Sequence, residues 1–222
     1  MSYQVGIDLG TTYTAAAVHR DEKASIFSLG GRAAAIPSVV LLREDETILT
    51  GEATVRRAIT GPSGSLVSSS VGSATPPRSS SGAVRTPAEA LMARLLRAVL
   101  DEVTTRDGAS VSRIAVSHPA NWGPCEQLDL FRQALRLAGL DQDSVVTLTE
   151  PEAAAISTPT RNGSRKGRSS VYDLGGGTFD ACVLQRTHGG STSSASPRAS
   201  SAWAASTSAA SSPTSPAPST SH

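Results

Sequence analysis

Apolar and polar residues alternate along the chain with two different periods, which predicts strands interleaved with helices. Short apolar or small-residue runs predict strands at 3–9, 12–18, 24–28, 36–42, 112–118 and 145–148. We also predict helices at 52–60, 86–105, 125–138 and 150–157, and in the helix at 86–105 apolar residues recur four apart. Strands that alternate with helices in this way indicate the α/β fold class.

Several helix ends carry capping signals. Residues 86–89 (TPAE) offer Thr as the N-cap, Pro as the first helical residue and Glu to close a capping box. Residues 149–152 (TEPE) repeat the capping box before a short Ala-rich helix. Gly139 is positioned to end the helix at 125–138. The sequence therefore predicts the ends of these helices as well as their presence.

A second strand pair, at 169–174 and 178–184, repeats the plan of the first pair at 3–9 and 12–18. Residues 8–12 (DLGTT) and 173–178 (DLGGGT) share one arrangement, in which a strand leads through Asp, Leu, a glycine turn and Thr into the next strand. We expect a duplicated half-domain with a cleft between its halves.

Composition excludes several classes of function. The chain has 20 Lys and Arg against 19 Asp and Glu, so its charge indicates neither nucleic acid nor an acidic membrane as a partner. Cys125 and Cys182 lack metal-ligand spacing, and we interpret both as buried thiols. The N-terminus has no signal-peptide or membrane-span pattern, which favours a cytoplasmic location. Ser, Ala, Pro, Thr and Gly dominate 61–85 and 187–222, where we expect weak order and disorder respectively.

Each glycine turn is suited to phosphate binding, because backbone N–H groups without a nearby Cβ approach a polyphosphate closely. Asp8 and Asp173 end their strands where a carboxylate holds Mg²⁺, usually through water. One such turn alone is more often a plain hairpin. In the second copy, however, three successive glycines each cost up to about 1 kcal/mol relative to Ala, which favours function. The commoner phosphate loops, GxxxxGKS or GxxxxGKT and a GxGxxG that opens a helix after a strand, do not occur in the sequence.

Four segments resemble, in order, the motifs of the seventy-kilodalton heat-shock chaperones, the heat-shock protein 70 family. Residues 5–14 (VGIDLGTTYT) and 172–180 (YDLGGGTFD) are similar to its two phosphate motifs. Residues 114–120 (IAVSHPA) and 149–155 (TEPEAAA) resemble its connecting motif and its Glu-Pro-x-Ala-Ala-Ala segment. The resemblance implies a ribonuclease-H-like lobe of the actin, hexokinase and heat-shock superfamily, with a mixed sheet, flanking helices and an incomplete second lobe.

The resemblance also implies ATP or ADP and Mg²⁺ as cofactors. The nucleotide-binding residues that it implies are Gly10, Thr11, Thr12, Tyr13, Gly175, Gly176 and Gly177, with Asp8 and Asp173 at the metal. The implied catalytic residues are Glu150, Asp173 and Thr178. Pro119 matches a proline that transmits nucleotide state, although a loop-starting proline explains it equally well. Implied partners are unfolded client proteins and co-chaperones, engaged through a C-terminal domain absent from the sequence, with no nucleic acid or membrane.

The resemblance covers about 1–60 and 86–186, and it departs from the family elsewhere. Ser70 aligns where the family has a catalytic Lys, and no Lys occurs between 61 and 86. Because that cation stabilises charge on the γ-phosphate, we expect an ATP hydrolase of weak or absent activity. The chain ends soon after the second turn, which predicts a partial nucleotide-binding domain at 1–186 and a disordered tail at 187–222. We hypothesise that 61–85 and 187–222 are reading-frame disruptions.

Rival functions remain open at this stage. A sugar or acid kinase of the same superfamily shares the phosphate turns, an actin-like nucleotide sensor needs no catalysis, and a truncated fragment would have no function. Individual residues also have plain interpretations: His118 is expected to be a hydrogen-bonded histidine at a strand end, Trp122 a loop anchor, and Asp180 either structural or part of the second phosphate turn.

Overall fold

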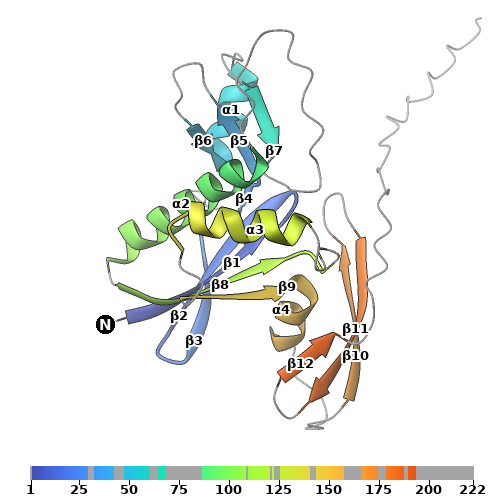
Figure 1. The fold of residues 1–222 in the computed structure, drawn as a ribbon. Coiled ribbons are helices and arrows are strands. Elements are labelled where there is room, and N and C mark those ends of the chain that lie inside the picture. The colour runs from blue at the N-terminus through green and yellow to red at the C-terminus, as the bar shows by residue number, and fades with distance from the viewer. Residues whose placement is uncertain are drawn as a thin grey trace, which may run out of the picture.

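The computed structural model describes residues 2–29, 33–42, 48–60, 65–68, 87–108, 110–120, 122, 126–140, 144–157, 167–174, 179–187 and 190–193. Its main sheet has the order β3 (Lys23–Phe27), β2 (Tyr13–Arg20), β1 (Ser2–Leu9), β8 (Ser110–His118) and β9 (Val145–Thr149). The first three strands are antiparallel, whereas β8 runs parallel to both β1 and β9 (Figure 1). The expected mixed sheet is confirmed.

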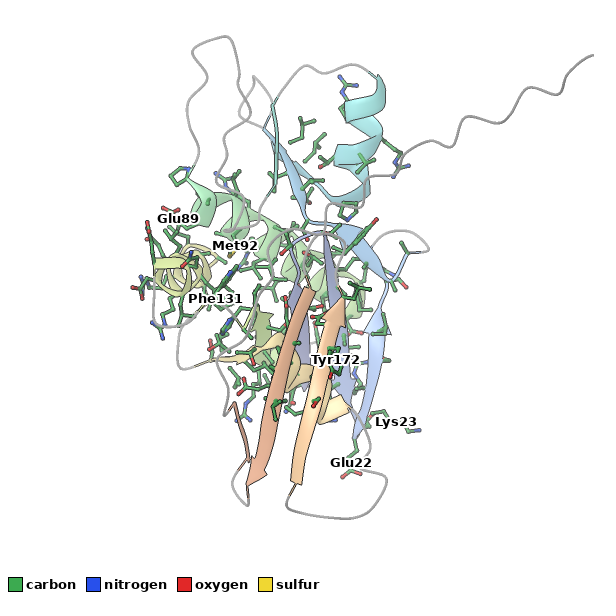
Figure 2. All side chains as sticks on the ribbon, turned by 90° about the vertical axis from the view of Figure 1, so that its right-hand side faces the viewer. Glu22, Lys23, Glu89, Met92, Phe131 and Tyr172 are labelled. Atoms are coloured by element: carbon green, nitrogen blue, oxygen red, sulfur yellow. The ribbon has the colours of Figure 1, made fainter. Side chains whose placement is uncertain are left out.

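Helices α2 (Ala88–Asp107) and α3 (Glu126–Leu137) pack together over one face of this sheet (Figure 1). Strand β1 alternates strictly, so that Tyr3, Val5, Ile7 and Leu9 point into the core while the intervening residues face the other side. Met92 of α2 and Phe131 of α3, both almost fully buried, contribute to the same core (Figure 2). Helices α2 and α3 do not cover the opposite face of the sheet, and the candidate site lies on that face.

The helix ends show which capping predictions are correct. Gly139 ends α3 as expected: its φ is +73°, and the Leu140 N–H donates to the Leu135 carbonyl, which is the hydrogen bond of a Schellman motif. At the start of α2 the expected capping box is wrong. The N-cap is Pro87, one residue later than expected, and no side chain of the described residues caps the helix. Proline has no side-chain acceptor, so Pro87 itself cannot cap the first N–H groups of the helix.

A small second sheet is made of β6 (Ile48–Thr50), β5 (Val39–Leu42) and β7 (Ser65–Ser68), with α1 (Gly51–Thr60) packed against β4, β5 and β6. The single strand expected at 36–42 is wrong. The chain forms β4 (Ala35–Pro37), which pairs with β2, and then leaves that sheet at Ser38 to enter β5. At this break the Ser38 hydroxyl and N–H donate hydrogen bonds to the β1–β2 turn.

The second predicted hairpin is present as β10 (Gly167–Leu174) and β11 (Phe179–Thr187), followed by β12 (Gly190–Ser193). Helix α4 (Glu150–Ser157) contacts β8 and β9 on one side and β10 and β11 on the other (Figure 1). Strands β7 and β12 lie in stretches whose composition predicts little order, so composition alone misses both. None of the helices described here is long and apolar enough to cross a membrane.

Candidate functional site

The first glycine turn joins β1 to β2 at the edge of the sheet face that α2 and α3 leave uncovered. The ladder closes at the pair Leu9 and Thr14, and residues 10–12 form the turn beyond it. A Cβ built on Gly10 would lie 2.6 Å from the carbonyl oxygen of Tyr13, which is far inside van der Waals contact. Because the obstacle is backbone, no rotamer change relieves it, and the tight turn requires glycine at this position.

Ser38 holds this turn from its buried side through hydrogen bonds. Its hydroxyl donates to the Gly10 carbonyl over 2.7 Å, and its N–H donates to the Thr12 carbonyl over 2.9 Å. Since the one hydroxyl hydrogen of Ser38 is used for Gly10, the Thr14 hydroxyl must be the donor in the 2.8 Å bond between Thr14 and Ser38. Thr14 and Ser38 are fully buried, at 0% exposure.

Sequence reasoning missed Ser38. Its only local signal is a polar residue inside the otherwise apolar run at 36–42. Buried polar groups are rarely tolerated without hydrogen-bond partners, so that interruption was the available clue that Ser38 binds another segment.

The side of the turn that faces away from Ser38 is accessible to solvent. Thr11 and Thr12 are partly exposed, and Tyr13 is 57% exposed. Among the residues that the structure describes, no partner exists for the side-chain hydroxyl of Thr11 or Thr12. The predicted nucleotide-binding residues Gly10, Thr11, Thr12 and Tyr13 therefore form one continuous turn with two hydroxyl groups available to a ligand.

Asp8 precedes this turn on the face that the helices leave uncovered. It is exposed, whereas its neighbours Ile7 and Leu9 are buried in the core. Its partner across the parallel ladder is Ser117 of β8, whose hydroxyl donates to Asp8 Oδ1 over 2.6 Å. The carboxylate thus has one oxygen held within the protein, while the side chain as a whole stays accessible.

The surroundings of Asp8 are made of small residues. Gly6, Ala15, Ala17 and Ala115 occupy neighbouring positions on the same face of β1, β2 and β8. Within the described residues, no group of three His, Cys, Asp or Glu side chains gathers to hold a metal ion. An accessible carboxylate beside a phosphate-binding turn nevertheless suits Mg²⁺, which prefers oxygen donors and retains waters and phosphate oxygens among its ligands.

Glu150 begins α4 directly after β9. The predicted capping box forms in part: the N–H of Thr149 donates to Glu152 Oε2 over 2.9 Å, and the Thr149 hydroxyl donates to the same oxygen over 2.8 Å. Glu150 is partly buried, and its helix lies between the main sheet and the second hairpin. The capping interaction therefore fixes the start of the helix that carries this carboxylate.

The second hairpin forms as the sequence predicts, and in its register Asp173 lies opposite Asp180 and Leu174 opposite Phe179. Asp173 is partly buried. The turn itself, with Gly175, Gly176, Gly177 and Thr178, lies outside the described residues, as does the side chain of Asp180. The expectation that the two glycine turns face each other across a cleft therefore stays a prediction.

A buried aromatic cluster lies at the end of β8. The rings of His118 and Trp122 stack in parallel with centroids 6.0 Å apart, and Phe131 packs against both. His118 Nδ1 bonds the Pro119 carbonyl over 3.0 Å, and the Trp122 N–H bonds the same carbonyl over 3.2 Å. The interpretations of His118 as a hydrogen-bonded histidine and of Trp122 as a loop anchor are confirmed. Of the two cysteines, Cys182 is buried as expected, and Cys125 lies outside the described residues.

Burial lowers the pKa of His118 below its ordinary value of 6.5. The Pro119 carbonyl and the Glu152 carboxylate oppose this effect, and Arg132 adds slightly to it. His118 is therefore a neutral core residue near pH 7.

The model of one protein family, described as Hsp70 protein, matches residues 4–74 and 77–195. The fold of that family is the actin- and hexokinase-like arrangement expected from the sequence, and the mixed sheet with its flanking helices agrees with an incomplete lobe of it. The expectation that the resemblance stops at 60, resumes at 86 and ends at 186 is wrong. Within 61–85, residues 65–68 form β7, which pairs with β5. The hypothesis of reading-frame disruptions stays a prediction.

Proposed function

Because the chain belongs to the Hsp70 protein family and is an Hsp70-like nucleotide-binding module, we propose that it binds Mg-ATP and Mg-ADP at its first glycine turn. The observation that carries the proposal is the turn itself. Its Gly10 cannot be replaced by another residue, and Ser38 holds the Gly10 carbonyl by a hydrogen bond. The hydroxyls of Thr11 and Thr12 lie on the accessible side of the turn. A turn fixed before the ligand arrives binds phosphate without an ordering cost at that moment.

In this proposal different residues bind the phosphates, the magnesium ion and the attacking water. Gly10, Thr11, Thr12 and Tyr13 bind phosphate oxygens on one side, and Gly175, Gly176 and Gly177 bind them on the other. Asp8 and Asp173 hold the hydration shell of a magnesium ion, which when bound neutralises phosphate charge. Glu150 and Thr178 orient the water that attacks the γ-phosphate in line.

Hydrolysis is proposed to be slow, because Ser70 stands where the resemblance to the family places a catalytic lysine. The lysines of the sequence are Lys23 and Lys166, and the latter lies outside the described residues. Lys23 begins β3 at the opposite end of the β2–β3 hairpin from the phosphate turn (Figure 2). The length of β2, Tyr13–Arg20, separates the two by about 23 Å at the usual strand rise. Lys23 therefore does not stabilise the transition state.

Calorimetric titration with Mg-ATP and Mg-ADP tests the binding proposal, with unloaded Mg²⁺ as the reference titration. Saturable heat with one site supports the proposal, and a rise in melting temperature with ligand concentration supports it independently. Absence of both, in a chain that melts cooperatively, would overturn it. Phosphoryl transfer to a sugar in the same samples would instead favour the kinase-like alternative.

Client proteins and co-chaperones are the partners that family membership suggests. We propose them as partners of any longer assembly in which this module acts. Nucleotide-dependent capture of an unfolded polypeptide by the chain would support that role directly.

A further inference from the structure

Asp8 and Ser117 lie opposite each other on neighbouring parallel strands, although 109 residues separate them in the sequence. The hydroxyl of Ser117 is 2.6 Å from Asp8 Oδ1, a short distance typical of a donor bound to a charged carboxylate. Ser117 is 5% exposed, whereas Asp8 is exposed. A buried hydroxyl therefore reaches from inside the protein to a carboxylate on the surface of the candidate site.

The Ser117 hydroxyl also has a backbone alternative, the Ile7 carbonyl, but that oxygen is 3.5 Å away. The hydrogen therefore belongs to the Asp8 carboxylate. The terminal torsion of an aspartate is broad and roughly two-fold, so an exposed carboxylate without a fixed partner samples many orientations. A single short bond to one oxygen selects one orientation and leaves the other oxygen for a ligand.

We propose that Ser117 is a positioning residue for Asp8, and that it orients the carboxylate toward the hydration shell of the magnesium ion that accompanies the nucleotide. This inference rests on the proposed function. Groups that hydrogen-bond the ligands of a metal fix their orientation, and removing such groups usually weakens metal affinity. Ser117 acts through Asp8 and needs no contact with the nucleotide.

The test compares Ser117→Ala and Ser117→Thr with the unaltered chain, measuring ATP affinity with Mg²⁺ and again with chelator. Ser117→Ala is expected to weaken Mg-ATP binding about tenfold, the lower end for a lost partner of a metal-binding group. Affinity for metal-free ATP is expected to be unchanged. Ser117→Thr keeps the hydroxyl and is expected to restore Mg-ATP binding.

A double-mutant cycle with Asp8→Asn decides whether the effect passes through Asp8. In the Asp8→Asn background, Ser117→Ala is expected to have no further effect on Mg-ATP affinity. Equal weakening of metal-free and magnesium-loaded ATP, or an undiminished effect in the Asp8→Asn background, would overturn the positioning role. If Ser117→Ala does not fold, Ser117→Cys takes its place, because the thiol keeps the shape but is a weak donor.

The two proposals fail in different ways. If the unaltered chain binds no nucleotide under any condition, the proposed function is wrong. If it binds Mg-ATP more tightly than metal-free ATP and Ser117→Ala preserves that difference, only the role of Ser117 is wrong.

Discussion

Ser38 and Gly10 are 28 residues apart in the sequence, yet the buried serine hydroxyl donates to the partly buried glycine carbonyl over 2.7 Å. The bond joins the point where the chain leaves the main sheet to the turn that is proposed to bind phosphate. The position of the turn is therefore set by a residue from another segment as well as by its own glycine.

Ser38→Ala should destabilise the protein and weaken nucleotide binding. The substitution leaves the fully buried Thr14 hydroxyl and the partly buried Gly10 carbonyl without their partner, which typically costs about 1–3 kcal/mol of unfolding free energy. Urea unfolding measures the loss. Ser112→Ala is the matched control, because the exposed Ser112 also donates to a backbone carbonyl, that of Tyr3, and its loss should cost under about 0.5 kcal/mol. Equal losses in the two variants would contradict the role assigned to Ser38.

Gly10→Ala should abolish measurable Mg-ATP binding, because the new methyl group would meet the Tyr13 carbonyl oxygen at 2.6 Å and force the turn open. Gly6→Ala is the control on the same strand, since a Cβ there meets nothing within 4 Å. Calorimetric titration of both variants should show binding only for Gly6→Ala. Normal affinity in Gly10→Ala would mean that this turn does not bind the nucleotide.

His118 should make stability depend on pH below about 6.5. In that range the unfolded chain binds the proton while the buried folded-state imidazole stays neutral, so protonation favours unfolding. The contribution of neutral His118 to the free energy of unfolding is fully present above pH 6.5. It is lost as pH drops toward the lower folded-state pKa, by at most about 1.4 kcal/mol per pH unit for one proton. Urea unfolding at pH 7.5, 6.5 and 5.5 measures the slope.

His118→Gln should flatten that slope, whatever its effect on total stability. His19→Gln, at an exposed position on β2, should leave the slope as it is in the unaltered chain. An identical slope in the His118→Gln variant would show that other groups cause the pH dependence.

Ser70→Lys should raise the rate of ATP hydrolysis, because it supplies a cation at the position that we expect, from the resemblance to the family, to correspond to a catalytic lysine. Groups that stabilise transition-state charge are often worth a hundredfold or more, and an imperfectly placed one should still give roughly tenfold. Release of inorganic phosphate under saturating Mg-ATP measures the gain. Ser79→Lys adds the same charge at another position of the same stretch and should give none. A gain in both variants would point to net charge rather than position.

Much of the fold is encoded locally, and the sequence by itself was sufficient to predict it. Both hairpins, the long helices, the end of α3 at Gly139 and the capping of α4 depend on residues within a few positions of one another. Such patterns reflect backbone geometry and nearby hydrogen bonds, which neighbouring residues determine. The candidate residues of the first turn were likewise predictable because they are consecutive.

Only the tertiary structure decided how the site is supported. Strand register placed Ser117 beside Asp8, the break between β4 and β5 placed Ser38 beneath Gly10, and helix packing closed the aromatic cluster around His118. These contacts join residues far apart in the chain, so no local window contains both partners. The same limit explains why β7 and β12 were missed: a short polar strand is stabilised by the ladder of its neighbour, and its own composition carries no sign of that pairing.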